Sequence, residues 1–405
     1  MRIGILTFYR VANFGANLQA LSTYRYLKKH NHQPIMINYY DRSWYEKFCN
    51  TIKKNVQASE HINFVEEQML KHTDLCFNAK DINEQISKFD IEAIIIGSDA
   101  VVQHHPIFAR LARGKRKPIY IEPISSDRLF PNPLWGVGIK SSVPLALMSA
   151  SSQNSQYVFF TSFTKKRMRK ALTRFTYLGV RDTWTYKMFH KCIGLEGVNL
   201  TPDPVFAFNN NALELVPSEK DIREKYDLPL KYVLISLRGQ CIPFKELQEL
   251  QSEFNKNSEI KCVALPMPEG ITFKHPFENE IPTPLNPLEW YALIKYSSGY
   301  IGCNMHPIVV SLHNVVPCFS IDNWGNRNWR GKAKNDGSSK VEDILNLFEL
   351  RNNRIAIGIS GCHINVSQIV SAILNFPYDT VRIRAKEMQT KYQRMMDEIL
   401  LTFNK

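Results

Sequence analysis

The amino-acid sequence lacks several features that would place it in common classes. No apolar run approaches the roughly 20 residues of a membrane-spanning helix, so we expect no spanning segment. The eight cysteines include no Cys-x-x-Cys pair, which argues against a zinc ribbon and a disulfide scaffold. Without a G-x-G-x-x-G or Walker A motif, a dinucleotide cofactor is not indicated. No nucleic-acid-binding motif occurs, and we expect no nucleic-acid partner.

The composition is that of an ordinary globular protein. Hydrophobic residues make up 44% of the 405 residues, and the 23 Phe, 17 Tyr and 6 Trp exclude wholesale disorder. At about 100–200 residues per domain, the length predicts two or three domains. The net charge of +13 suits an anionic partner, which could be nucleic acid, a membrane face or a substrate.

The beginning of the chain predicts a strand, a loop, a helix and a second strand. Residues 2–8 are apolar and rich in strand formers, and residues 34–40 repeat that pattern. Between them, apolar residues recur at helical spacing at Leu18, Leu21, Tyr24 and Leu27. This βαβ unit predicts a parallel sheet.

The same layout continues along the chain. Further strands are predicted over 91–96, 145–149 and 175–180, and a second series over 232–237, 260–265, 300–302 and 318–321. Polar clusters follow the strands, at the end where open α/β sheets bind ligands. We therefore predict two α/β units over residues 1–208 and 223–375, a linker over 209–222, and a C-terminal helix over 376–405.

Six stretches of the sequence, in order, resemble the polysaccharide pyruvyl transferase family. They are GILTFYRVANFGANLQALSTYRYLKK, AIIIGSD, ALMSASS, LGVRDTWTYKMF, TPDPVF and GCNMHPIVVSLHNVVPCFSIDNWG. The resemblance implies two Rossmann-like domains facing a cleft, a glycosyltransferase-B-like arrangement with the acceptor on the N-terminal side and the donor on the C-terminal side. It also implies transfer of the enolpyruvyl unit of phosphoenolpyruvate to a sugar of a cell-surface polysaccharide or its lipid-linked precursor. The products are a pyruvate ketal and phosphate, and no cofactor is needed besides the donor.

The resemblance also implies site residues. The motif residues of the family fall on Asn13, Gly15, Ser98, Asp99, Arg181 and His306. One position departs from the pattern, because the R-x-H motif of the family reads Asn304-Met305-His306 here. An asparagine thus stands where an arginine would help to hold the anionic donor.

Arginine suits this donor because its planar fork matches carboxylate and phosphate oxygens. Arg181 and Arg238 each follow a predicted strand, one in each domain, and we expect both to face the cleft. Arg238 could replace the arginine missing at position 304. For Arg181, an ion pair with a carboxylate of its own helix is the alternative.

His306 precedes Pro307 at a predicted helix start, where the helix dipole disfavours the imidazolium and leaves a neutral base. Asp99 is expected to act as the acid or to orient an acceptor hydroxyl, with a turn or N-cap role as the alternative. Asn13 and Gly15 are expected to shape a loop whose N–H groups face the cleft.

A second helix start is predicted at Ser338, Ser339 and Lys340, which could bind phosphate. Plain N-capping explains the serines equally well. No acidic pair or histidine cluster has the spacing of metal ligands, so we expect no metal.

Two other functions stay open at this point. The same layout would suit a nucleotide-sugar glycosyltransferase, and Asn304 would suit a catalytically inactive relative that binds a glycan or an anion. We expect a cytoplasmic protein. The basic residues between 165 and 174 could hold it at the inner face of the plasma membrane, at about 1 kcal/mol per basic residue close to an anionic surface.

Overall fold

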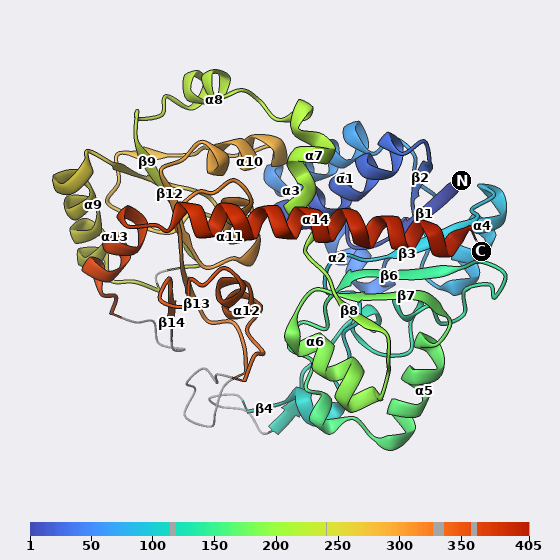
Figure 1. The fold of residues 1–405 in the computed structure, drawn as a ribbon. Helices are drawn as coiled ribbons and strands as arrows, with labels where there is room; N and C mark the ends of the chain where they lie inside the picture. Colours follow the sequence, from blue (N-terminus) through green and yellow to red (C-terminus); the bar gives the residue numbers. More distant parts are fainter. Residues whose placement is uncertain (114–118, 240, 327–335, 358–362, 405) are drawn as a thin grey trace.

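The computed structural model describes residues 1–113, 119–239, 241–326, 336–357 and 363–404. Within these residues the chain forms two α/β halves, each built around a six-stranded parallel sheet (Figure 1). This architecture confirms the predicted fold class of two Rossmann-like units.

The sheet of the first half has the order β2-β1-β3-β6-β7-β8. Its strands are β1 (Arg2–Leu6), β2 (Gln33–Met36), β3 (Ala93–Ile96), β6 (Leu145–Ala150), β7 (Phe175–Val180) and β8 (Val198–Leu200). The central strands are buried on both faces, which explains why β3 and β6 are almost continuous apolar runs. The strand predicted over residues 34–40 ends earlier, at Met36.

The sheet of the second half has the order β11-β10-β9-β12-β13-β14. Its strands are β9 (Tyr232–Ser236), β10 (Lys261–Ala264), β11 (Asn279–Glu280), β12 (Gly299–Gly302), β13 (Cys318–Asp322) and β14 (Arg354–Ala356). The direction of strand succession reverses between β9 and β12, as it does between β1 and β3 in the first half. Open α/β sheets bind ligands beside the carboxyl ends of the strands at such reversals.

Helices cover both sheets. Those of the first half are α1 (Phe14–Lys29), α2 (Arg42–Ile52), α3 (Val56–Gln68), α4 (Ala79–Lys88), α5 (Ser162–Leu172) and α6 (Thr183–Lys187). Those that follow are α7 (Phe208–Ala212), α8 (Glu219–Tyr226), α9 (Phe244–Ser258), α10 (Pro287–Lys295), α11 (Met305–His313), α12 (Lys340–Leu347) and α13 (Val366–Leu374). Within the connection from β3 to β6, β4 (Leu111–Arg113) and β5 (Ile119–Ile121) form an antiparallel pair.

The connection between the halves is not the plain linker predicted over 209–222. It contains α7 and the start of α8, because Phe208 and Ala212 are buried in the core. Asn211 donates hydrogen bonds to the carbonyl and hydroxyl oxygens of Ser22, which hold α7 against α1. Ser218 caps α8 by accepting a hydrogen bond from the Asp221 amide at 3.2 Å.

The last helix, α14 (Tyr378–Phe403), crosses both halves of the molecule (Figure 1). It packs on β7 of the first half and on α11 of the second. Tyr26 of α1 donates a hydrogen bond of 2.9 Å to Asp397. The side chains of α1, α10, α11 and α14 share one apolar core, so the two halves are packed together rather than merely linked. None of the described helices is long and apolar enough to cross a bilayer.

The packing of α14 can be tested with two isoleucines of the same helix. Ile399 is fully buried, whereas Ile383 is 60% exposed. We expect Ile399→Ala to lower the free energy of unfolding by about 2–5 kcal/mol through the lost contacts and the cavity. Ile383→Ala should change it by less than about 0.5 kcal/mol. Equal effects in urea denaturation would contradict the packing described here.

Candidate functional site

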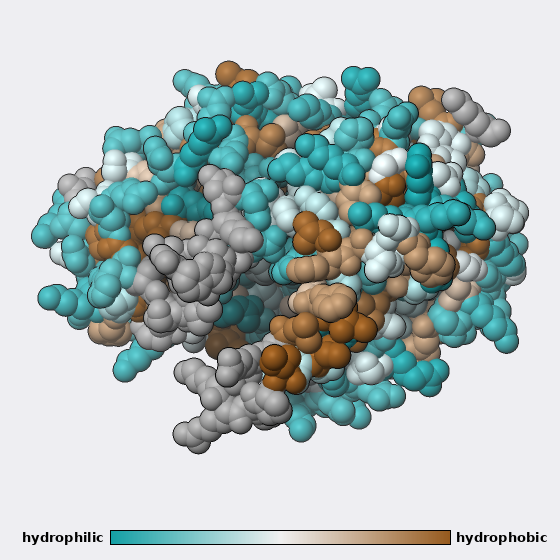
Figure 2. Space-filling model, turned by 90° about the horizontal axis from the view of Figure 1, so that it is seen from below, coloured by the Kyte–Doolittle hydropathy of each residue, from teal (hydrophilic) through white to brown (hydrophobic). Residues whose placement is uncertain are grey.

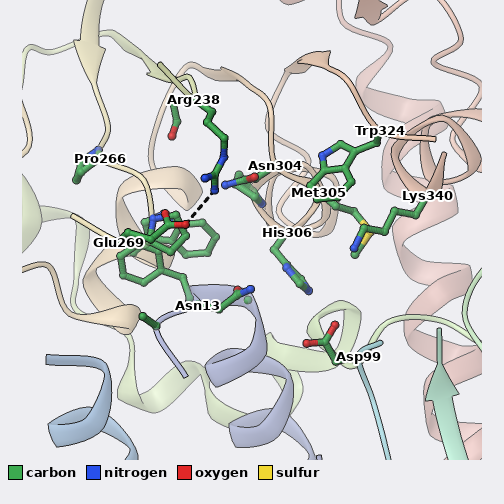
Figure 3. Close-up of a pocket in the computed structure, with 17 residues that line it drawn as sticks. Asn13, Asp99, Arg238, Pro266, Glu269, Asn304, Met305, His306, Trp324 and Lys340 are labelled. Carbon is green, nitrogen blue, oxygen red and sulfur yellow. Dashed lines mark hydrogen bonds and ion pairs between the residues drawn. The ribbon is translucent and has the colours of Figure 1, made fainter. Parts of the chain in front are cut away.

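A pocket of about 160 Å³ lies between the two halves (Figure 3). The first half contributes Asn13 and Gly15, which follow β1, and Asp99, which follows β3. The second half contributes residues that follow β9, β12 and β13: Arg238, Asn304, His306, Trp324 and Lys340. The carboxyl ends of the strands from both sheets therefore meet at one place, as the predicted cleft requires.

Gly15 and His306 bring the two halves into contact at this pocket. Gly15 lies in the first turn of α1, and a Cβ atom built on it would lie 1.9 Å from Cγ of His306. Only a residue without a side chain allows the imidazole to rest on this turn. The sequence predicted Gly15 as a loop-shaping residue, whereas the structure places it in a helix and gives it a packing role.

The imidazole of His306 is buried at the start of α11, which begins at Met305 rather than at the predicted Pro307. Its Nε2 atom lies 4.0 Å from Oδ2 of Asp203 and has no hydrogen-bond partner among the described residues. Burial lowers the pKa of His306 to about 4, and the nearby Asp203 carboxylate offsets only part of this effect. The ring is therefore neutral at pH 7 and able to accept a proton.

Arg181 does not line this pocket but lines a smaller one beside it, which shares Met305 and Lys340 with the first. Its buried guanidinium forms ion pairs with Asp99 at 3.1 Å and with Asp203 at 2.9 Å. Two carboxylates thus neutralise its single positive charge, while its Nε atom has no hydrogen-bond partner among the described residues. The alternative of an ion pair is the one observed, but the partners come from other loops and not from its own helix.

Asp99 lines the pocket, but not as the acid that the sequence suggested. Burial raises the pKa of its carboxyl, yet Arg181, His306 and Lys340 outweigh burial and keep the pKa below its ordinary value. A carboxylate that is ionised at neutral pH has no proton to donate. The remaining prediction, orientation of an acceptor hydroxyl, is compatible with this state.

The three serines predicted to bind substrate are engaged inside the protein. Ser98 donates a hydrogen bond of 2.9 Å to the carbonyl of Ser149. Ser338 accepts one from the Asn326 amide at 2.7 Å, and Ser339 caps α12. All three are buried, and none is among the residues that line the pocket. We therefore assign Ser98, Ser338 and Ser339 structural roles.

Lys340 is the best-placed cation of the site. It is the first residue of α12, and its ammonium lies 5.0 Å from the centre of the Trp324 ring. It forms no ion pair among the described residues. Burial lowers its pKa to about 8, with help from the charge of Arg181. The amine is therefore mostly protonated at pH 7 and yet close to titration.

Arg238 and Asn304 lie side by side at the rim of the pocket (Figure 3). The exposed guanidinium of Arg238 forms an ion pair with Glu269 at 3.0 Å. Asn304 occupies the N-cap position of α11, but its side chain makes no capping hydrogen bond. The first turn of α11 thus has no cap from the Asn304 side chain. Asn13, by contrast, caps α1 by accepting from the Ala16 amide at 3.3 Å.

Sequence reasoning missed Asp203, which connects several of these groups. Besides its ion pair with Arg181, it accepts a hydrogen bond from Gln19 of α1. Asp203 stands in the stretch TPDPVF, directly after the short strand β8. Its place after a strand was a usable signal, because the other polar residues of the site follow strands in the same way.

A family model for polysaccharide pyruvyl transferase matches residues 13–325, which is most of the chain. The chain belongs to the polysaccharide pyruvyl transferase family. Its members are enzymes, and the family implies a glycan as the acceptor. The search of curated proteins found no match.

Solved structures confirm the fold. The chain is similar to UDP-GlcNAc 2-epimerase from Neisseria meningitidis bound to UDP-GlcNAc, with a TM-score of 0.57, 9% identity, and coverage of 99% of this chain and 100% of that one. It is also similar to the S. aureus MnaA–UDP complex, with a TM-score of 0.53, 10% identity, and coverage of 100% and 96%. At such identities these likenesses establish the fold alone.

Among the residues that the structure describes, no three His, Cys, Asp or Glu side chains converge as metal ligands would. The expectation of a reaction without a metal stays a prediction.

The contact between Gly15 and His306 leads to a test by a double-mutant cycle. We expect Gly15→Ala to displace the imidazole and lower stability by about 1–3 kcal/mol, as overpacking does. In a His306→Ala background the same change should cost much less, because the clashing ring is gone. Denaturant unfolding of the four proteins measures the coupling. Additive effects would show that the ring does not rest on this turn.

Proposed function

We propose that this enzyme transfers the enolpyruvyl unit of phosphoenolpyruvate to a sugar of a glycan, forming a pyruvate ketal and releasing phosphate. The observation that carries the proposal is the distribution of charge in the pocket. Lys340 lies there without an ion-pair partner among the described residues, beside a neutral His306 and an ionised Asp99. Such a pocket suits a small anion that must react with a neutral hydroxyl.

The donor would be held by groups of the second half. Phosphoenolpyruvate carries a carboxylate and a phosphate, which the Lys340 ammonium, the Arg238 guanidinium and the N-terminus of α11 can bind. The volume of about 160 Å³ is below the roughly 300–1,000 Å³ of pockets for drug-sized ligands and suits a three-carbon donor. Arg238 beside Asn304 supplies the positive charge that an arginine at position 304 would have supplied.

The chemistry requires a proton at the vinyl carbon of the donor. We assign its delivery to Lys340, whose pKa of about 8 makes the ammonium a usable acid at neutral pH. Protonation turns the CH₂ group into a methyl group and leaves positive charge at C2. The ionised Asp99 carboxylate stabilises that charge electrostatically.

The acceptor hydroxyl then attacks C2. His306 takes its proton, since the imidazole is neutral at pH 7. The bond between C2 and the phosphate oxygen breaks, and a second hydroxyl of the same sugar attacks C2 to close the ketal. Two C–O bonds form and one breaks. The two hydroxyl groups release two protons. One restores the proton that Lys340 gave to the vinyl carbon, and the other leaves with phosphate.

The experiment that tests this function measures phosphate release from phosphoenolpyruvate with and without candidate glycans, followed by mass spectrometry of the glycan. We expect release that depends on the glycan, and a product that gains a pyruvate ketal and one negative charge.

The variant Arg238→Ala should raise the KM for phosphoenolpyruvate about ten-fold or more, because a charged hydrogen bond to the donor is lost.

A matched control is Arg382→Ala on α14. Its side chain is 63% exposed and paired with Asp379, as that of Arg238 is 67% exposed and paired with Glu269. Arg382→Ala should leave the KM for phosphoenolpyruvate unchanged.

Thermal stabilisation by UDP without any phosphate release from phosphoenolpyruvate would favour a nucleotide-sugar glycosyltransferase instead. Ligand binding without turnover, at protein concentrations that supply many sites, would identify an inactive relative.

The pH dependence of kcat/KM separates the two proton-transfer residues. A base must be deprotonated, so the rate should rise with pH through about 4, where His306 titrates. An acid must be protonated, so the rate should fall through about 8, where Lys340 titrates. In Lys340→Arg kcat/KM should drop at every pH, because a guanidinium is too weak an acid to deliver the proton, and the remaining rate should show no fall near pH 8, since arginine stays protonated. A fall near pH 8 that persists in this variant would assign the acid to another group.

A further inference from the structure

One face of the first half exposes an unusual number of large apolar side chains. They belong to residues 107–111, 119–121 and 158–163, which we call the apolar rim. Its large apolar side chains, apart from the buried Phe160, are between 42% and 72% exposed. Phe108 and Phe163, each 69% exposed, are its most prominent aromatic members. Single exposed apolar residues are normal on a protein surface, whereas a contiguous cluster of them marks an interaction surface.

The two parts of the apolar rim start side by side. His104, just before residues 107–111, packs its ring against Phe160 at 5.0 Å between centroids. Residues 107–121 follow β3 and residues 158–163 follow β6. They therefore leave the sheet at the same edge as Asp99 and α1, which line the pocket. Figure 2 shows brown side chains gathered beside a hollow on this face.

The apolar rim is bordered by positive charge. Helix α5 carries five Lys and Arg residues between 165 and 170 and no acidic residue. None of these five forms an ion pair in the part of the chain that the structure describes, and the guanidinium of Arg167 lies 5.5 Å from the centre of the Phe163 ring. The basic residues Lys115, Arg116 and Lys117 lie outside the described residues.

We propose that the apolar rim and α5 form a surface that docks on an anionic membrane. Apolar side chains beside unpaired cations are the combination that binds the interface of an anionic bilayer. A second copy of the chain fits this surface poorly. In a two-fold dimer the same patch faces itself, so the two α5 helices and their ten positive charges would be brought close together.

Docking in this way would place the pocket close to the bilayer surface, because the rim and the pocket share one edge of the sheet. A sugar carried on a lipid would then reach the pocket without leaving the membrane. This additional expectation rests on the proposed function, whereas the docking surface itself does not.

Co-sedimentation of the full chain with vesicles tests the docking surface. We expect binding to vesicles that contain phosphatidylglycerol, weak binding to vesicles of phosphatidylcholine alone, and release at high salt. Phe108→Ser and Phe163→Ser should each weaken binding roughly ten-fold or more. The control is Leu230→Ser, whose side chain is 84% exposed in the second half. It should bind like the wild type.

The charge is tested separately. The pair Lys166→Gln and Arg169→Gln should weaken binding about 30-fold, at the usual contribution of each basic residue near an anionic surface. The pair Lys53→Gln and Lys54→Gln removes the same charge from exposed positions after α2 and should have little effect. Equal losses in the two pairs would mean that only net charge matters and would overturn the proposal.

Two further results would also overturn it. One is no binding to anionic vesicles at low ionic strength. The other is a dimer in solution that dissociates when Phe108 or Phe163 is replaced. Phosphate release with a water-soluble glycan, measured on the same variants, should be unchanged. Loss of vesicle binding with intact release therefore separates a failure of the docking surface from a failure of the proposed function.

Discussion

The guanidinium of Arg181, held between Asp99 and Asp203, is the interaction on which the site depends. The three residues follow β7, β3 and β8, so their ion pairs join three strand ends of the first sheet. Asp203 extends the connection to Gln19 of α1. Removing one partner of such a buried pair costs about 3–5 kcal/mol, because a charge is left without compensation. Arg181 therefore joins the loops on the first-half side of the pocket.

This arrangement also decides the protonation states around the pocket. With Arg181 nearby, Asp99 stays ionised although it is buried. His306 is neutral because burial disfavours its charged form. Lys340 experiences burial and the positive charge of Arg181, and both bring its pKa toward neutrality. A buried cation with two acidic partners thus yields a pocket with an ionised carboxylate, a neutral base and an amine close to titration.

The docking surface and the pocket have a common structural origin. In a parallel sheet every strand ends at the same edge, so all the connections after the strands gather on one side of the molecule. Short connections, such as the one from β1 to α1 that ends at Asn13, line the pocket. Long ones, such as the connection from β3 to β6 that contains β4 and β5, expose apolar side chains. One edge of the sheet therefore carries both the pocket and the surface proposed to dock on the membrane.

Local sequence patterns determined much of the fold. Apolar runs placed most strands correctly, because central strands of a parallel sheet are buried on both faces. The capping role of Asn13, in contrast, was not predicted. The order of the six motifs indicated the family, and the motif residues indicated which polar side chains follow the strands. A local pattern contains no information about which side chain from a distant segment lies opposite.

For that reason the roles within the site were decided by the tertiary structure alone. Whether Arg181 faces a ligand or two carboxylates depends on loops that are far apart in the sequence. The need for glycine at position 15 arises from an imidazole almost 300 residues further along the chain. Composition and periodicity determined that two parallel sheets would form and where their ligand-binding edges lie. Pairing across those edges determined which charges are neutralised and which remain free, because electrostatic interactions act through space and not along the chain.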